Sequence, residues 1–430
     1  MESEIKMKKI PKARWYRIGL LLFLIYLTAF VDRSNIGMAA PLMVKSLGLS
    51  TASVGVLLSG FFWGYVITQI PGGWVAGKFS AKSLIVFALI IWGVAAVLTG
   101  VVHSFAALMA VRFIMGLAEG VVWPAFSIYF VNWYPDEERA RAINFSEMSL
   151  PISSIIMSPL AGWMIHTWNY EMMFILQGIP PLILAVVFYF LAPDSPAKDR
   201  RLSKEERDYL LENKSTAVKE KGSLLEVISN PKIWVFSIIY FLWITGLYSF
   251  GLWMPSLMKQ LSSMGIQAIG FLSAIPFILA AIAMYVNASW SDRHGGNRSL
   301  FVAIPLLIGG LALIIEHFIG FSLVANLIVL CVAGIGIYAA MGPWWAWAMS
   351  FVPRDQAGTA NGLINLCGNF GGIVGPIVVG AVAHDGNLIN GFYILGFAMV
   401  VGALLAAFVA GRFRVNHSTE QETSGKPVQV

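Results

Sequence analysis

Residues 288–300 read ASWSDRHGGNRSL, and residues 73–84 read GWVAGKFSAKSL. Each stretch is a short polar segment between two long apolar blocks. The offset is 215 residues, and a second pair of stretches lies at a similar offset of 217 residues, with EERARAIN at 137–144 and RDQAGTAN at 354–361. The first of this pair is followed by SPLAG and the second by GPIVVG. Similarity at two nearly equal offsets predicts that the chain consists of two half-chains with the same order of elements.

The apolar blocks on either side of these segments have the length of membrane spans. The chain has 430 residues, of which 57% are hydrophobic and 12% charged, whereas soluble proteins average about 25% charged residues. A span needs roughly 20 mostly apolar residues, and the blocks lack the alternation of a membrane β-barrel. We therefore predict an all-α membrane protein with twelve spans, at 17–40, 51–75, 83–103, 105–131, 141–166, 171–192, 232–258, 266–290, 298–318, 321–349, 356–383 and 390–411.

The longest polar segment divides the spans into two pseudo-symmetric six-helix bundles. Its middle, LSKEERDYLLE, has helical spacing and predicts a short surface helix. The basic N-terminus runs into an apolar block longer than a signal peptide allows, which favours a retained first span. The predicted domains are an N-terminal segment, a first bundle, a linker, a second bundle and a disordered tail, at 1–16, 17–192, 193–231, 232–411 and 412–430.

The basic residues predict how the chain is oriented. Lys and Arg concentrate in the termini and in the even-numbered loops, whereas the opposite side carries Lys45 and Lys259. The positive-inside rule then places both termini in the cytoplasm of a cell-membrane protein. This distribution explains the net charge of +6 without nucleic-acid binding. Cys331 and Cys367 lie within apolar blocks, where packing is the expected role rather than a disulfide.

Asp32 and Arg33 lie side by side within the first span, in AFVDRSNIGMAA. Each costs about 2.5–3.5 kcal/mol at the centre of a membrane helix. Neighbours on a helix point about 100° apart, so each is expected to meet a partner on another span or a water-filled cavity. A structural ion pair that holds the bundle together is the alternative to a role in function.

Arg112 and Glu119 are seven residues apart in the fourth span and therefore share a helix face, with Gly116 between them. An apolar cavity favours the protonated form of a carboxyl group, so Glu119 and Asp32 are candidate proton carriers. An arginine fork can hold a carboxylate through two parallel hydrogen bonds, which makes Arg33 and Arg112 candidates for binding an anion. A structural Arg112–Glu119 network remains the alternative.

Further polar and aromatic residues on other spans could contact a ligand. Tyr65 and Gln69 lie one helical turn apart in span two, as do Asn365 and Asn369 in span eleven. These groups can read hydroxyls or a carboxylate, or they can join helices through hydrogen bonds. Tyr248 in span seven and Trp345 in span ten are further candidates for the wall of a cavity. Glu147, near the end of span five, is a candidate for an inner gate or for simple interfacial exposure.

Taken together, these stretches resemble a known family. The layout resembles the major facilitator superfamily, and SDRHGGNR resembles its signature loop. VDRSNIGMAAP, FFWGYVITQIPGGW, RFIMGLAEGVVWPA, PDSPAKDRRLSKEER and NGLINLCGNFGGIVGP are similar to stretches of the anion:cation symporter family within it. The resemblance covers essentially the whole chain, but it does not identify a substrate.

The resemblance implies proton-coupled transport of an organic acid by alternating access. Known members carry sugar acids such as galactonate, glucarate and hexuronates, as well as tartrate, phthalate, sialic acid and glutamate. The family uses the matching acids of spans one and four, here Asp32 and Glu119, for proton coupling. Asp292 and Arg293 match the gating residues of the signature loop. Gly77 and Lys78 stand where the first-half copy has Asp-Arg, which removes the basis for expecting the usual ion pair there.

Other functional classes have less support in the sequence. A drug exporter of the same fold would carry a glycine-rich run in span five, where this chain reads LPISSIIMSPLAG. A sensor would need an output domain, whereas the tail is short and polar. No metal-ligand spacing is present, and no nucleotide-binding motif supports ATP-driven transport. The membrane charges and the family resemblance lead us to expect an importer, not an enzyme, with no cofactor. The fold usually works as a monomer, and the expected partners are the anion, protons and the lipid bilayer.

Overall fold

The computed structural model describes residues 12–78, 80–213, 224–294, 298–353, 356–383 and 386–412. Within these residues every regular element is a helix, and twelve segments are long and apolar enough to cross a membrane. The expected disordered tail and most of the expected N-terminal segment lie outside the described residues. All-helical architecture follows from the bilayer, because a helix satisfies its backbone hydrogen bonds within one segment.

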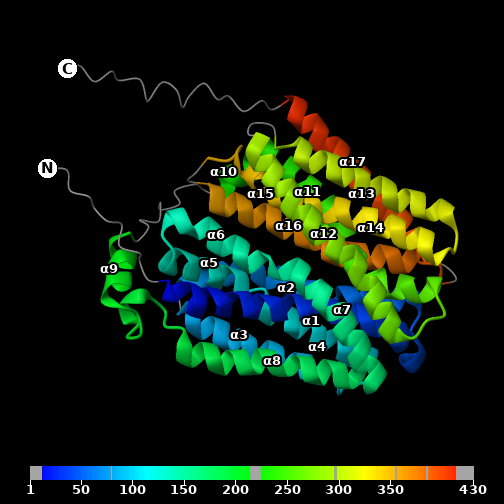
Figure 1. The fold of residues 1–430 in the computed structure, drawn as a ribbon, viewed down its shortest axis with the longest axis horizontal. Helices are drawn as coiled ribbons and strands as arrows, with labels where there is room; N and C mark the ends of the chain where they lie inside the picture. The colour runs from blue at the N-terminus through cyan, green and yellow to red at the C-terminus, as the bar shows by residue number, and fades with distance from the viewer. Residues whose placement is uncertain are drawn as a thin grey trace.

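The spans alternate in direction within two bundles that lie one above the other in Figure 1. The first bundle consists of η1 (Trp15–Gly19) with α1 (Leu20–Leu47), α2 (Thr51–Lys78), α3 (Ala81–Thr99), α4 (Phe105–Glu119) with α5 (Val122–Trp133), α6 (Asp136–Glu147) with α7 (Ser149–Thr167), and α8 (Tyr170–Leu191). The second consists of α11 (Pro231–Leu261), α12 (Ile266–His294), α13 (Leu300–Ile319), α14 (Leu323–Ala339) with α15 (Met341–Met349), α16 (Ala357–Val382) and α17 (Ile389–Arg412).

Polar and glycine residues set the ends of several spans. Ser80 and Ser104 accept backbone hydrogen bonds from Ser83 and Ala107 and so cap the starts of α3 and α4. Asn169 caps α8 in the same way. Helix α1 ends at Gly48, whose φ of 62° is left-handed and therefore suits a residue without a side chain. These short signals set where the spans begin and end, and α1 runs to Leu47, beyond its expected end at 40.

Spans four and ten are both interrupted at corresponding places. α4 stops at Glu119 and α5 begins at Val122, whereas α14 stops at Ala339 and α15 begins at Met341. This correspondence agrees with the repeat that the sequence predicts, whereas span five is broken after Glu147 and its counterpart α16 is continuous. The interruption of span four directly follows one of the two candidate proton carriers.

The first part of the linker lies against the first bundle. η2 (Pro196–Lys198) leads to α9 (Lys204–Glu212), which confirms the predicted surface helix, and α10 (Leu224–Ser229) precedes the second bundle. The guanidinium of Arg14 joins α9 to α6, because it donates to Glu206 at 2.8 Å and to Glu138 at 2.7 Å. Burial opposes the charge of Arg14, but the two carboxylates outweigh this and raise the pKa of the guanidinium. We call the side of the molecule with α9 the basic end and the opposite side the far end.

The two bundles meet closely at the far end. α2 crosses α16, and α7 crosses α12. A Cβ atom on Gly380 of α16 would lie 2.7 Å from the carbonyl oxygen of Thr51, and one on Gly270 of α12 would lie 2.4 Å from that of Ser158. Only glycine allows backbones to approach so closely. The far end is therefore closed by helix crossings between the two bundles.

Candidate functional site

Arg33 forms a buried ion pair near the centre of the membrane. Its side chain projects from α1 toward α4, where Nε donates to Oε1 of Glu119 at 2.5 Å, and a guanidinium NH2 group also pairs with this carboxylate. The rings of Phe30 and Tyr65 lie 4.7 and 4.6 Å from the guanidinium carbon. The faces of these two rings attract the guanidinium. The negative charge of Glu119 offsets the free-energy cost of burying it.

Glu119 and Arg112 share a face of α4, as their spacing predicts, and both contact α1. Each is 1% exposed. Arg112 donates to the backbone carbonyl of Asp32 at 3.0 Å, while its Nε and one NH2 group find no partner among the described residues. Oε2 of Glu119 is likewise without a partner there. Unused donors and acceptors therefore remain on both side chains, beside the buried ion pair of Arg33 and Glu119.

Asp32 points away from Arg33, as expected of neighbours on a helix. Its Oδ2 accepts a hydrogen bond from the indole of Trp92 on α3 at 2.5 Å. Its Oδ1 lies 3.3 Å from the amide nitrogen of Asn35. Asn35 also donates to Gln177 of α8 at 2.9 Å. The two adjacent charges of span one thus find different partners, on α3 and on α4.

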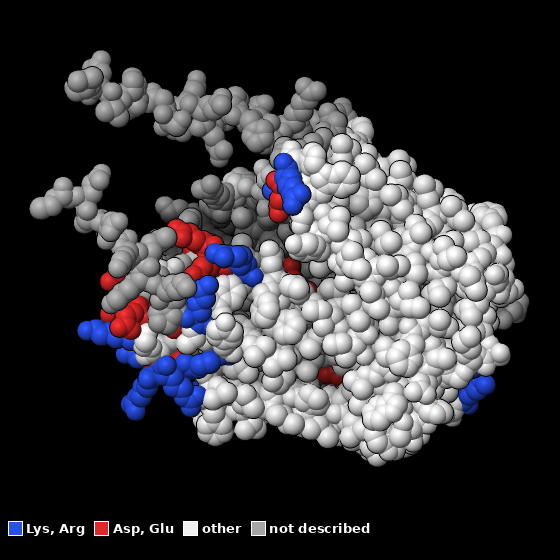
Figure 2. Space-filling model, viewed as in Figure 1, with Lys and Arg blue, Asp and Glu red and all other residues white. Residues whose placement is uncertain are grey.

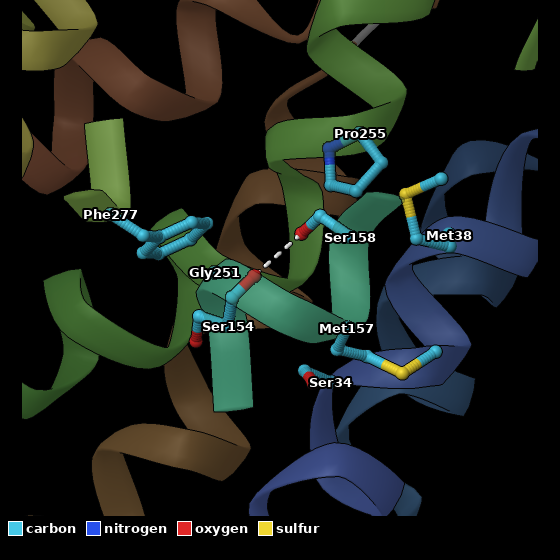
Figure 3. Close-up of a pocket in the computed structure, with 8 residues that line it drawn as sticks. All are labelled: Ser34, Met38, Ser154, Met157, Ser158, Gly251, Pro255 and Phe277. Atoms are coloured by element: carbon cyan, nitrogen blue, oxygen red, sulfur yellow. Dashed lines mark hydrogen bonds between the residues drawn. The ribbon is translucent and has the colours of Figure 1, made fainter. Parts of the chain in front are cut away.

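A central cavity lies beside Arg33, between the two bundles. Among its lining residues are Arg33 and Ser34 of α1, Ser153 and Ser154 of α7, Tyr248 of α11 and Tyr338 of α14. Figure 3 shows an adjoining pocket, where Ser34 and Met38 face Ser154, Met157 and Ser158 across from Gly251, Pro255 and Phe277. The cavity thus presents one cation, several hydroxyls and apolar walls at mid-membrane depth.

The second bundle adds a polar cluster next to this cavity. The hydroxyl of Tyr248 donates to Oδ1 of Asn369 at 3.2 Å. The amide of Asn369 donates in turn to the backbone carbonyl of Asn365 at 2.8 Å. The ring of Tyr248 lies 4.4 Å from that of Phe62 on α2, so this cluster touches the first bundle. Gln69 lies one turn beyond Tyr65 on α2, with its amide atoms buried.

Trp345 and Glu147 lie toward the basic end from this cluster. Trp345 is half-buried, with its ring 5.2 Å from that of Tyr240. Its neighbours Trp344 and Trp347 are buried within the second bundle. Glu147 is half-buried and is the last residue of α6 in the first bundle.

Asp292 and Arg293 lie at the basic end, far along the chain from the buried charges. Asp292 pairs with Arg298 at 3.1 Å, and its side chain is 68% exposed. Arg293 is exposed as well. The structure thus places the signature loop of the second half at the end of α12 and not in the central site.

Trp92, Asn35 and Gln177 were not expected from the sequence. Trp92 stands within an apolar block and Gln177 within another, so neither differs from packing residues in the sequence alone. Asn35 follows Asp32 by three residues and therefore shares its helix face, which is a usable signal. Among the residues that the structure describes, no cluster of three or more His, Cys, Asp or Glu could hold a metal ion.

The family model described as Major Facilitator Superfamily matches residues 22–376. A putative tartrate transporter of Agrobacterium vitis is 30% identical, with all of both chains covered. A quinolone resistance transporter of Acinetobacter baumannii is 26% identical, with 98% of this chain and 99% of that one covered.

A sugar-acid transporter and a solved structure are similar as well. A probable galactarate/D-glucarate transporter of Bacillus subtilis is 26% identical over 93% of this chain and 92% of its own. The crystal structure of a bacterial homologue of the human lysosomal transporter Spinster has a TM-score of 0.73. It is 19% identical and covers 93% of this chain and 96% of that chain, so it shows the shared fold.

Proposed function

The chain belongs to the major facilitator superfamily, and on that premise we propose that it imports a small organic anion, a sugar acid or tartrate, together with protons. The chain is a multi-pass transporter and not an enzyme. The names of its relatives point to organic acids of this kind. The proposal goes further than these names in assigning the coupling ion, the direction of transport and the residues.

The ion pair between Arg33 and Glu119, at the edge of the cavity, carries the proposal. A substrate carboxylate and the carboxylate of Glu119 compete for the same guanidinium fork. Protonation of Glu119 removes its charge and weakens its hold on Arg33. The fork then becomes available to the anion, so that proton uptake favours anion binding. Binding of the proton to Glu119 and binding of the anion to Arg33 are thereby coupled directly.

The hydroxyl-bearing residues of the cavity fit the remainder of a sugar acid. Ser34, Ser153 and Ser154 approach from the first bundle, and Tyr248 and Tyr338 from the second. Hydroxyls both donate and accept hydrogen bonds, as do the hydroxyls of a polyol acid. A ligand held by both bundles can couple its binding to their relative motion, as expected for a site at a repeat interface.

The charge distribution supports an orientation with the basic end in the cytoplasm. In Figure 2, Lys and Arg gather around the side of the molecule where α9 lies. The positive-inside rule assigns this side to the cytoplasm. The closed far end then faces the outside, so a substrate bound in this state would leave toward the cell interior.

Uptake by purified protein in liposomes with an alkaline interior tests the proposal. The panel contains galactonate, glucarate, glucuronate, tartrate, phthalate and glutamate. We expect one acid to accumulate, and the accumulation to collapse when the pH gradient is dissipated. Accumulation that persists without the gradient, or no accumulation of any acid, would contradict proton-coupled import.

A proton-driven exporter is the second candidate, because a quinolone resistance transporter is among the relatives. Quinolones carry a carboxylate, which Arg33 could also bind. In liposomes with an acidic interior, such an exporter would exchange internal protons for external drug. The drug would therefore accumulate inside the liposomes. Accumulation of a quinolone in these liposomes, with none of the acids transported, would replace the import proposal.

The glycine crossing at the far end predicts a gating phenotype. A valine at Gly380 would meet the carbonyl oxygen of Thr51, so α2 and α16 could no longer approach. We expect Gly380→Val to lower uptake about tenfold, roughly the effect of 1.4 kcal/mol on a conformational equilibrium. It should also increase labelling of a Ser154→Cys reporter, in a background without Cys331 and Cys367, by an impermeant thiol reagent added outside.

Gly362→Val is the matched control for this prediction. Gly362 lies on the same helix, and a Cβ atom there would meet nothing within 4 Å. The cost of valine in the helix is the same at both positions. Equal effects of the two substitutions on labelling would show that the crossing does not control access.

A further inference from the structure

The carboxylate of Asp32 lies within the first bundle, separate from the cavity beside Arg33. Asp32 is 1% exposed and its partner Trp92 is fully buried. Asp32 does not line the central cavity as Arg33 and Ser34 do. A substrate in that cavity would thus meet Arg33, which is paired with Glu119, whereas Asp32 is enclosed by α3, α4 and α8. The groups that form hydrogen bonds to Asp32 therefore determine how readily it binds and releases a proton.

Within the part of the chain that the structure describes, every hydrogen bond to this carboxylate comes from a donor that carries no charge. The indole of Trp92 can only donate, and it reaches Oδ2 at 2.5 Å. Asn35 must direct its NH2 group toward a carboxylate that accepts, and the bond measures 3.3 Å. The second hydrogen of this NH2 group goes to Oε1 of Gln177 at 2.9 Å. Gln177 thereby fixes how the amide of Asn35 is turned.

The side chain of Gln177 is itself fixed by its surroundings. Its NH2 group lies 3.3 Å from the sulfur of Met157 on α7 and 3.6 Å from that of Met164. Sulfur accepts hydrogen bonds only weakly. Because the NH2 group of Gln177 points at the two sulfurs, its carbonyl oxygen faces Asn35. The series from Gln177 through Asn35 to Asp32 is therefore directed, with donors pointing at the carboxylate.

The charged groups that act on Asp32 both belong to α4. They are Arg112 and Glu119. Arg112 donates to the backbone carbonyl of Asp32 and not to its carboxylate. Glu119 has its Oε1 occupied by Arg33. α3 and α8 face Asp32 with the neutral Trp92 and Gln177, and α7 faces this network with the thioethers of Met157 and Met164. The neutral donors are thus the direct contacts of this acid.

We propose that Trp92, supported by Asn35 and Gln177, is a positioning residue that holds the carboxylate of Asp32 and sets the pH at which it exchanges its proton. This inference rests on the proposed function, because it assigns Asp32 as a coupling acid. A hydrogen bond to a carboxylate favours its ionised form. Loss of the indole N–H would therefore let Asp32 keep its proton to higher pH, so the proton would be taken up more readily outside and released less readily inside.

The direct test follows the protonation of Asp32 without any substrate. Infrared spectra of purified protein are recorded over a pH series, and the protonated-carboxyl band that Asp32→Asn removes is assigned to Asp32. In Trp92→Phe we expect the midpoint of this band to move by about one pH unit toward alkaline pH, as the loss of a hydrogen bond to a charged group predicts. Asn35→Ala should move it in the same direction by less, because its bond is longer.

Trp243→Phe provides the matched control. Trp243 is a fully buried tryptophan of the second bundle, and its indole donates to the backbone carbonyl of Ile337 at 2.8 Å. This variant loses a comparable hydrogen bond but should leave the midpoint unchanged. Thermal unfolding of each variant shows whether it is folded. If Trp92→Phe proves unfolded, the shift in Asn35→Ala decides the question.

Transport measurements separate this inference from the proposed function. With tartrate and glucarate as probes, Trp92→Phe should move the external pH of half-maximal uptake in the same direction as the infrared midpoint. Asp32→Asn should lose uptake against a gradient while keeping exchange. An unmoved midpoint in folded Trp92→Phe, or an Asp32 band that does not titrate, overturns the inference. A shifted infrared midpoint without proton-driven uptake of any acid overturns the proposed function alone.

Discussion

Arg33→Gln should abolish both uptake against a gradient and exchange of the substrate, lowering each at least about 100-fold. The substitution removes the cation that faces the cavity and the fork that would hold a carboxylate. Hydrogen bonds to charged groups contribute about 1.5–3 kcal/mol each, so losing a two-point contact exceeds the 2.8 kcal/mol or so that corresponds to 100-fold. Uptake and exchange of the acid identified in liposomes measure the effect.

Two further variants show whether this loss reflects binding or folding. Arg33→Gln alone leaves Glu119 buried without its cation, which is destabilising. In the double variant Arg33→Gln/Glu119→Gln both charges are absent, so thermal stability should recover while transport does not. Arg33→Lys keeps a charge without the planar fork and should retain the fold with weak transport. Recovery of transport in the double variant would show that Arg33 serves only to neutralise Glu119.

The fold was predictable because the bilayer restricts what a chain can form. Span seven was expected at 232–258 and runs over Pro231–Leu261, whereas span one was expected to end at 40 and runs to Leu47, and span five was expected to begin at 141 and begins at Asp136. Apolar length and the need to satisfy the backbone determine such segments almost independently of their neighbours. The linker helix was predictable for a related reason, because Ser203 caps it and its apolar residues recur at helical spacing.

The partners of the membrane charges were only partly predictable. Sequence spacing placed Arg112 and Glu119 on one face and separated the directions of Asp32 and Arg33, and the structure agrees. The sequence spacing did not show that Arg33 contacts Glu119 or that Asp32 contacts Trp92, because helix rotation and tilt determine which helix faces meet. A tryptophan among isoleucines and valines looks like packing until an acid is found at its N–H. The glycine crossings at the far end were hidden for the same reason.

Glu119→Gln should separate anion binding from proton coupling. Glutamine keeps the size of the side chain but cannot take up a proton in this range, and it no longer pairs as an anion with Arg33. The fork is then free at every pH, so we expect exchange to persist, with an apparent affinity about tenfold higher at alkaline pH than in the unsubstituted protein. A tenfold change corresponds to about 1.4 kcal/mol. This is close to the lowest value for a hydrogen bond to a charged group. In Glu119→Gln the substrate no longer has to break such a bond between Glu119 and Arg33.

Uptake against a gradient should fail in the same variant, because no proton is carried with the anion through this site. The pH dependence of binding should flatten, since the competitor for Arg33 no longer titrates. Binding measured by isothermal titration at several pH values, together with uptake and exchange in liposomes, distinguishes these effects. Full accumulation driven by the pH gradient in Glu119→Gln would show that competition for Arg33 is not the coupling step, and would leave Asp32 as the acid that carries the proton.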